Sequence, residues 1–122
     1  MAPERKLYQK VKRNTPSIKW IRIENLSILG CPDLLGYNTS GHFFTVELKV
    51  AKGNKVKFSP HQIAFHVQHP KNTFILIEAL GQRCFKLFPG SEIRGLSTEG
   101  HLYGWPLADS WSEIQKIFEE IV

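Results

Sequence analysis

The chain has 122 residues, of which 42% are hydrophobic and 22% are charged, the size and composition of one globular domain spanning residues 1–122. It has no run of about 18 apolar residues, and no apolar signal core follows the basic segment 1–13, so we expect a soluble, intracellular protein. The net charge of +5, from 16 basic and 11 acidic residues, favours a polyanion as partner.

The N-terminal segment has the pattern of a short helix followed by a strand. Pro3 and Glu4 suit the first turn of a helix, which we expect over about 3–13. The next segment, IKWIRIEN, is rich in β-branched and aromatic residues and alternates along its length. It predicts a strand over about 18–24.

Two further segments, 33–37 and 42–50, predict an antiparallel hairpin. They flank Asn38-Thr39-Ser40-Gly41, whose residue types favour a turn. The second strand alternates cleanly, with one face formed by Phe44, Val46, Leu48 and Val50 and the other by Phe43, Thr45, Glu47 and Lys49. We expect the first of these faces to meet the core and the second to lie away from it.

The remaining elements follow from capping and periodicity. Ser59, Pro60 and Gln62 form the start signal of a helix over about 60–69, with a capping box between Ser59 and Gln62. TFILIEAL and RCFKLF, separated by Gly81-Gln82, predict a second strand pair. The segment GSEIRGLSTEGHLYGWP has the composition of a loop, and ADSWSEIQKIFEEIV predicts a final helix whose apolar face consists of Trp111, Ile114, Ile117, Phe118 and Ile121.

The two cysteines, Cys31 and Cys84, indicate where the protein works. They lack a CxxC spacing, and no secretion signal accompanies them, so they favour a reducing compartment. We expect thiols in or near the core of an intracellular protein that is not secreted.

Charged residues in the predicted hairpin require an explanation, because each costs several kcal/mol to desolvate unless it is paired. If the turn centres on 38–42, Asp33 lies across from Val46 or Glu47, and the two carboxylates reach one point in space. Such carboxylates repel unless a cation separates them, and their oxygens suit Mg²⁺ or Mn²⁺. Lys49, two residues beyond Glu47 on the same face, can stabilise the charge that develops on an attacked phosphate.

Cys31-Pro32-Asp33 followed by Glu47-Leu48-Lys49 resembles the PD-(D/E)XK nuclease signature. The longer text GCPDLL...FFTVELKVAKGNKVKFSPHQIAFH is similar to small phage and bacterial nucleases of the virus-type replication-repair (VRR-NUC) group and to archaeal-type Holliday-junction resolvases. The resemblance covers about residues 20–80. It implies an α/β restriction-endonuclease-like core, a mixed central sheet flanked by helices.

The resemblance also implies the roles of individual residues. Asp33, Glu47 and the backbone carbonyl of Leu48 would bind Mg²⁺ or Mn²⁺, and Lys49 would be catalytic. Related nucleases carry a helix glutamine, matched here by Gln62, although the capping box explains that residue equally well. They also carry an acid on the N-terminal helix, for which Glu4 is preferred and Glu24 competes.

The implied activity is a metal-dependent endodeoxyribonuclease that selects branched, flapped or junction DNA in phage or bacterial replication, recombination or repair, in the cytoplasm of a bacterium or bacterial host. Basic residues near the site form a candidate DNA-backbone surface, although a solvated loop or a structural salt bridge would also explain them: Arg22, Lys52, Lys55 and Lys57. Symmetric cleavage of a junction would require a homodimer. The rival interpretation is a non-catalytic nucleic-acid-binding module on a nuclease scaffold.

Overall fold

The computed structural model describes residues 3–23 and 30–122, and their centre is a five-stranded mixed sheet. The strands are β1 (Lys19–Arg22), β2 (Leu34–Tyr37), β3 (Phe43–Ala51), β4 (Thr73–Ala79) and β5 (Cys84–Pro89), in the spatial order β1-β2-β3-β4-β5. β3 and β4 pair in parallel, whereas β1–β2, β2–β3 and β4–β5 are antiparallel. The predicted mixed-sheet α/β class is confirmed.

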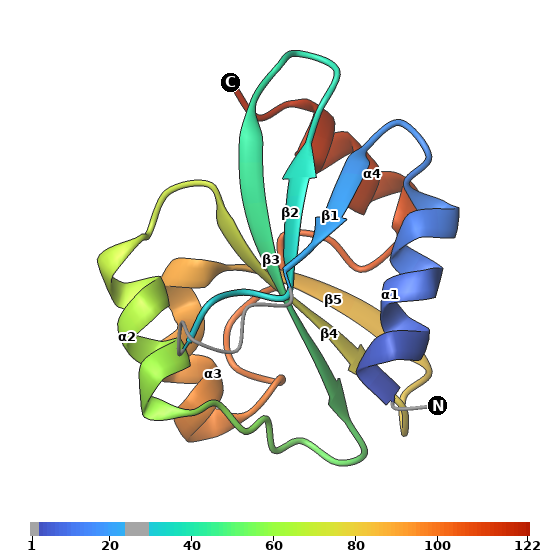
Figure 1. The fold of residues 1–122 in the computed structure, drawn as a ribbon. Helices are drawn as coiled ribbons and strands as arrows, with labels where there is room; N and C mark the ends of the chain where they lie inside the picture. The colour runs from blue at the N-terminus through green and yellow to red at the C-terminus, as the bar shows by residue number, and fades with distance from the viewer. Residues whose placement is uncertain (1–2, 24–29) are drawn as a thin grey trace.

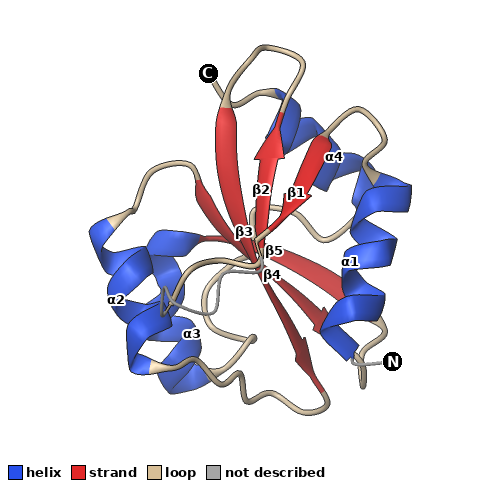
Figure 2. Ribbon diagram, viewed as in Figure 1, coloured by secondary structure: helices blue, strands red, loops and turns tan. Residues whose placement is uncertain are grey.

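Helices cover both faces of this sheet (Figures 1 and 2). On one face lie α1 (Pro3–Asn14) and α4 (Trp111–Glu119), and on the other lie α2 (Pro60–Gln68) and α3 (Ile93–Glu99). α2 connects the parallel strands β3 and β4, as such a crossover requires. Within the described ranges, no helix is long and apolar enough to cross a membrane.

The first core lies between the sheet and the helices α1 and α4. Its β3 members are the predicted core residues Phe44, Val46 and Leu48, each at most 3% exposed. The predicted face of the last helix is confirmed, since Ile114 and Phe118 are fully buried and Ile121 packs with them. Burial of a large apolar side chain stabilises the fold by about 1.5–3 kcal/mol, so this core holds β3 firmly.

A second core covers the opposite face of the sheet, and it corrects the prediction that Glu47 lies away from the interior. The side chain of Glu47 is only 1% exposed. Its face of the sheet continues into a separate apolar cluster that consists of Ala51, Val56, Ile75, Ile77, Phe88, Ile93 and Leu96. The prediction failed because the parallel neighbour β4 and the helices α2 and α3 bury this face as well.

The segment 90–106, predicted as loop, contains a 3₁₀ helix (Gly90–Glu92) and α3. Ile93 and Leu96 of α3 are fully buried and belong to the second core. Gly95 interrupts the helical pattern in the sequence, and a Cβ there would lie 2.2 Å from the Tyr103 ring, so a larger residue would require that ring to move. The predicted strand over 18–24 is shorter, and its last residue falls outside the described ranges.

Candidate active site

The β2–β3 hairpin brings Asp33 and Glu47 together. Its register pairs Leu34 with Val46, which places the preceding Asp33 beside Glu47. The carboxylate of Asp33 accepts a hydrogen bond at Oδ2 from the backbone N–H of Leu48, at 2.8 Å. The predicted proximity of the two acids is therefore confirmed, and the bond to β3 fixes the position of Asp33.

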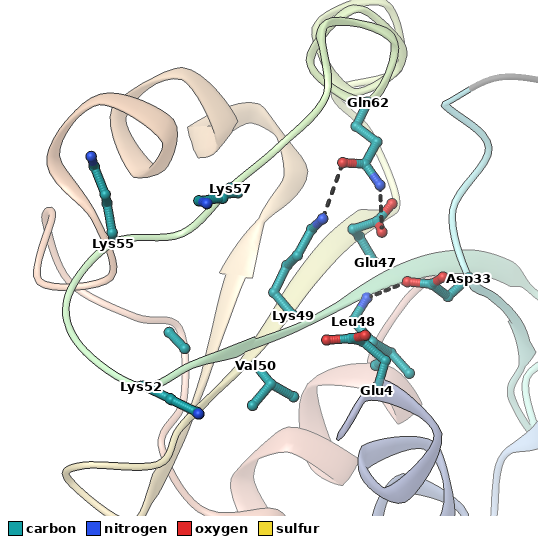
Figure 3. Close-up of a pocket in the computed structure, with 11 residues that line it drawn as sticks. Glu4, Asp33, Glu47, Leu48, Lys49, Val50, Lys52, Lys55, Lys57 and Gln62 are labelled. Carbon is teal, nitrogen blue, oxygen red and sulfur yellow. Dashed lines mark hydrogen bonds between the residues drawn. The ribbon is translucent and has the colours of Figure 1, made fainter. Parts of the chain in front are cut away.

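These acids lie in a pocket of about 480 Å³ that collects most of the predicted site residues (Figure 3). It is lined by Glu4, Asp33, Glu47, Leu48, Lys49, Val50, Ala51, Lys52, Lys55, Lys57 and Gln62. Arg22 is not part of this lining; its guanidinium lies 5.7 Å from the centre of the Tyr8 ring. Glu24, the competing third acid, lies outside the described residues.

Glu47 has the most perturbed environment in the pocket. Its Oε2 accepts a hydrogen bond from Gln62 Nε2 at 3.1 Å, while the buried Oε1 has no hydrogen-bond partner among the described residues. Burial, followed by the nearby Asp33 carboxylate, raises the pKa of Glu47 to about 9, although the Lys49 ammonium opposes the shift. Without a bound cation, Glu47 therefore retains its proton at neutral pH.

Gln62 takes part in the capping box and also contacts two residues of β3. It closes the predicted capping box of α2, because its backbone N–H donates to Ser59 Oγ at 3.1 Å and its Oε1 accepts from Ser59 N at 2.9 Å. The same Oε1 accepts from Lys49 Nζ at 3.1 Å, and its Nε2 donates to Glu47. The start of α2 thus links the acid and the lysine of β3 through one amide (Figure 3).

Lys49 is held in place by a second contact. Its Nζ lies 5.1 Å from the centre of the Phe58 ring, a cation–π distance. The Lys49 ammonium donates to the Gln62 amide and contacts the face of the Phe58 ring. These two contacts define its position in the pocket before any ligand binds. A fixed charge of this kind costs no reorganisation when negative charge develops nearby.

Glu4 reaches the same pocket from the first turn of α1. Its charge is one of the causes that raise the pKa of Glu47. The described residues nevertheless contain no group of three or more His, Cys, Asp or Glu side chains that could hold a metal ion. Asp33 and Glu47 thus form a pair of carboxylates, and Glu4 lines the same pocket.

Two residues that the sequence analysis missed hold the lysine-rich loop at 52–57. Asn54 Nδ2 donates to the carbonyl of Glu99 at 2.7 Å, and Asn54 Oδ1 accepts from the backbone N–H of Leu102 at 2.9 Å. His101, 3% exposed, has its Nε2 at 2.9 Å from the carbonyl of Gly53. No local pattern could reveal these contacts, because they join segments 45 or more residues apart.

Comparisons with known proteins establish the fold. No family model matches the sequence, and no curated protein matches it either. Among solved structures, the chain is similar to Hjc, a Holliday junction resolvase from the archaeal hyperthermophile Archaeoglobus fulgidus. The match has a TM-score of 0.53 at 18% sequence identity and covers 70% of this chain and 72% of the resolvase. The chain therefore has an α/β fold that an archaeal Holliday junction resolvase also adopts.

Proposed function

We propose that the protein is a metal-dependent nuclease that hydrolyses phosphodiester bonds of branched, flapped or junction DNA. The observation that carries the proposal is the carboxylate pair of the buried Glu47 and the half-buried Asp33, with the fixed ammonium of Lys49 beside it. Removing one carboxylate from water beside a second one costs free energy unless a cation binds between them. The similarity to a Holliday junction resolvase supports junction DNA as the first substrate to test.

The residues of the pocket fit a divalent cation. Glu47 Oε1 is buried without a partner among the described residues, and the nearby Asp33 raises the pKa of Glu47, so a cation bound between the two groups would offset their repulsion. Mg²⁺ is commonly held by one or two carboxylates, with waters and substrate phosphates completing its shell. Asp33 and Glu47 would therefore hold Mg²⁺ or Mn²⁺, with the carbonyl of Leu48 as the proposed third ligand.

When bound, the cation would supply Lewis-acid activation of the attacking water and neutralise charge at the scissile phosphate. The ammonium of Lys49 stabilises the negative charge that grows on the phosphate oxygens during attack. Gln62 keeps both partners in position, because its amide contacts Lys49 and Glu47 at the same time. No histidine base is needed for this chemistry.

Lys52, Lys55 and Lys57 line the same pocket and are exposed. We propose that they bind the DNA backbone on the side of the pocket away from Asp33. Such contacts release counterions, so DNA binding weakens as salt increases. A homodimer would give two sites for symmetric cleavage of a junction. We also propose that the chain belongs to the PD-(D/E)XK superfamily and to its VRR-NUC group.

A cleavage panel tests the proposed function. Four-way junction, flap, fork and linear duplex DNA are incubated with Mg²⁺, Mn²⁺ or EDTA, and the isosteric variants Asp33→Asn and Glu47→Gln are compared with wild type. We expect metal-dependent cleavage by wild type and a loss of about 100-fold or more in each variant. Glu120→Gln, an exposed residue at the end of α4, is the matched control and retains full activity.

Two results would contradict the proposal. The first is full activity in Asp33→Asn or Glu47→Gln, because the acids would then have no part in the reaction. The second is salt-sensitive DNA binding without product at any metal concentration, which is the behaviour of a non-catalytic binding module.

A further inference from the structure

A second hollow lies on the sheet face that carries Glu47, near the β2–β3 turn. It has a volume of about 330 Å³, and we call it the aromatic patch: Lys19, Ile21, Tyr37 and Phe43. Residues opposite one another on neighbouring strands share a face, and the register pairs Lys19 with Tyr37 and Tyr37 with Phe43. Ile21 follows on the same face, two residues beyond Lys19.

The aromatic patch and the carboxylates are parts of one continuous surface. Phe43 and Glu47 are four residues apart on β3, so their side chains project from the same face. At about 3.3 Å per residue, they are separated by about 13 Å along the strand. This distance corresponds to about four stacked nucleotides of one DNA strand, or fewer when the strand is stretched.

The patch is open to solvent, whereas Glu47 on the same face of β3 is only 1% exposed. Ile21 is 58% exposed and Phe43 is 55% exposed. The rings of Tyr37 and Phe43 contact each other with a centroid distance of 4.6 Å. Figure 1 shows that α2 and α3 lie beside the other end of β3 and do not extend over the β2–β3 turn. The two aromatic rings thus contact each other on the sheet and leave an apolar surface open to solvent.

The size and charge of the patch favour a nucleobase over a second protein chain. A stable protein interface buries about 800 Å² on each partner and places several large apolar side chains at its centre. Here Ile21 and Phe43 are the large exposed hydrophobic residues, which is too few for such a centre. An unpaired base needs only an exposed aromatic ring for stacking and a cation for its phosphate, which Lys19 provides.

We propose that the aromatic patch binds an unpaired base of the DNA strand whose phosphate occupies the Asp33 and Glu47 site. The proposal rests on the nuclease function proposed above and names its substrate class more closely. Bases inside a duplex are covered on both sides by their neighbours, so only an unpaired or terminal base offers a free face. The patch therefore selects flaps, forks and opened branches over intact duplex.

Binding measured in EDTA tests the patch separately from catalysis. Fluorescence anisotropy compares a fork that carries a single-stranded arm with a linear duplex of equal length. We expect Phe43→Ala to weaken binding of the fork by about 5- to 150-fold, the effect of one lost stacking contact, and to leave duplex binding unchanged. Abasic nucleotides in the arm should weaken wild-type binding equally and cause no further loss in Phe43→Ala.

Trp105→Ala is the matched control, because Trp105 is an aromatic residue with 93% exposure in the segment between α3 and α4. Its removal should change neither affinity. Equal fork binding by Phe43→Ala and wild type would overturn the proposal, as would a dimer that dissociates in Phe43→Ala without any fork-specific loss. Wild-type protein that shows the arm-dependent binding but cuts no DNA would support the patch and reject the nuclease function.

Discussion

Glu47 and Gln62, fifteen residues apart in the chain, are joined by a 3.1 Å hydrogen bond from the amide Nε2 to the carboxyl Oε2. Gln62 belongs to the first turn of α2, whereas Glu47 lies in the middle of β3. The side chain of Gln62 therefore accepts a hydrogen bond from the N-cap backbone of α2 and also contacts Glu47, the proposed metal ligand. The predictions below separate these two roles and those of the residues around them.

The first prediction concerns the stability of the metal-free protein. The pKa of Glu47 is about 9 in the folded state, against an ordinary value of 4.5. Below pH 4.5, Glu47 is protonated in both the folded and the unfolded state. Above pH 4.5 the unfolded chain loses this proton while the folded protein keeps it. The free energy of unfolding therefore falls by up to about 1.4 kcal/mol per pH unit until the pH approaches 9. Urea unfolding in EDTA across this window measures the slope.

Two comparisons complete this first prediction. Glu47→Gln cannot ionise, so its stability should lack this fall and exceed that of wild type at pH 8. Mn²⁺ should restore wild-type stability at pH 8 and leave the variant unchanged, because binding to the folded state alone stabilises it. If wild type and Glu47→Gln showed the same dependence of stability on pH in EDTA, the pKa of Glu47 would not be raised in the folded state.

The second prediction separates the cap of α2 from the site. Ser59→Ala removes the N-cap acceptor and should cost about 1 kcal/mol of stability, but it leaves the contacts of Gln62 with Glu47 and Lys49. Gln62→Ala removes those contacts and should lower kcat about 10- to 100-fold. Thermal unfolding and single-turnover cleavage of the same two variants measure the difference. Equal cleavage rates in both would assign Gln62 to the cap alone.

The third prediction concerns the lysine loop. Lys55→Ala should weaken binding of every DNA shape to a similar extent and lower the slope of log affinity against log salt by about 0.9, the contribution of one phosphate contact. Lys116→Ala is the charge-matched control, since Lys116 is exposed on α4 at the opposite face of the sheet. Titrations at several salt concentrations measure both slopes, and an unchanged slope in Lys55→Ala would exclude this loop from the DNA contact.

The fourth prediction concerns Asn54, which positions that loop without a charge of its own. Asn54→Ala removes two hydrogen bonds to the chain after α3, each with a net contribution of about 0.5–1.5 kcal/mol. KM for DNA should rise several-fold while kcat changes little, and the amides at 52–57 should exchange faster with solvent. Asn14→Ala removes a comparable bond at the end of α1 and serves as control. A loss confined to kcat would contradict a role in positioning.

Local patterns were sufficient for the hairpin and the helix starts. The register that places Asp33 beside Glu47 follows from the turn residues and from the alternation in β3, both of which lie within twenty residues of sequence. The capping box at Ser59 is equally local, and it is present in the structure. The core of the site could therefore be predicted before any tertiary contact was known.

Contacts between distant segments account for what the sequence did not reveal. The burial of Glu47 depends on β4 and on the helices beyond it, so alternation alone predicted a face away from the core. α3 was missed because Gly95, which packs against the Tyr103 ring, interrupts the helical pattern of the sequence. The contact between His101 and Gly53 joins residues 48 apart and has no signature in either segment.

The packing of β3 on both faces also limits how this protein can acquire a new preference for DNA. A substitution at Val46 or Leu48 changes the first core, and one at Glu47 changes the chemistry of the pocket, so few changes in the strand leave the fold intact. Phe43, Lys52 and Lys55 are exposed, so substitutions there do not disturb either core. Variation among natural relatives, and useful libraries for directed evolution, should therefore concentrate at the two ends of β3 and spare its centre.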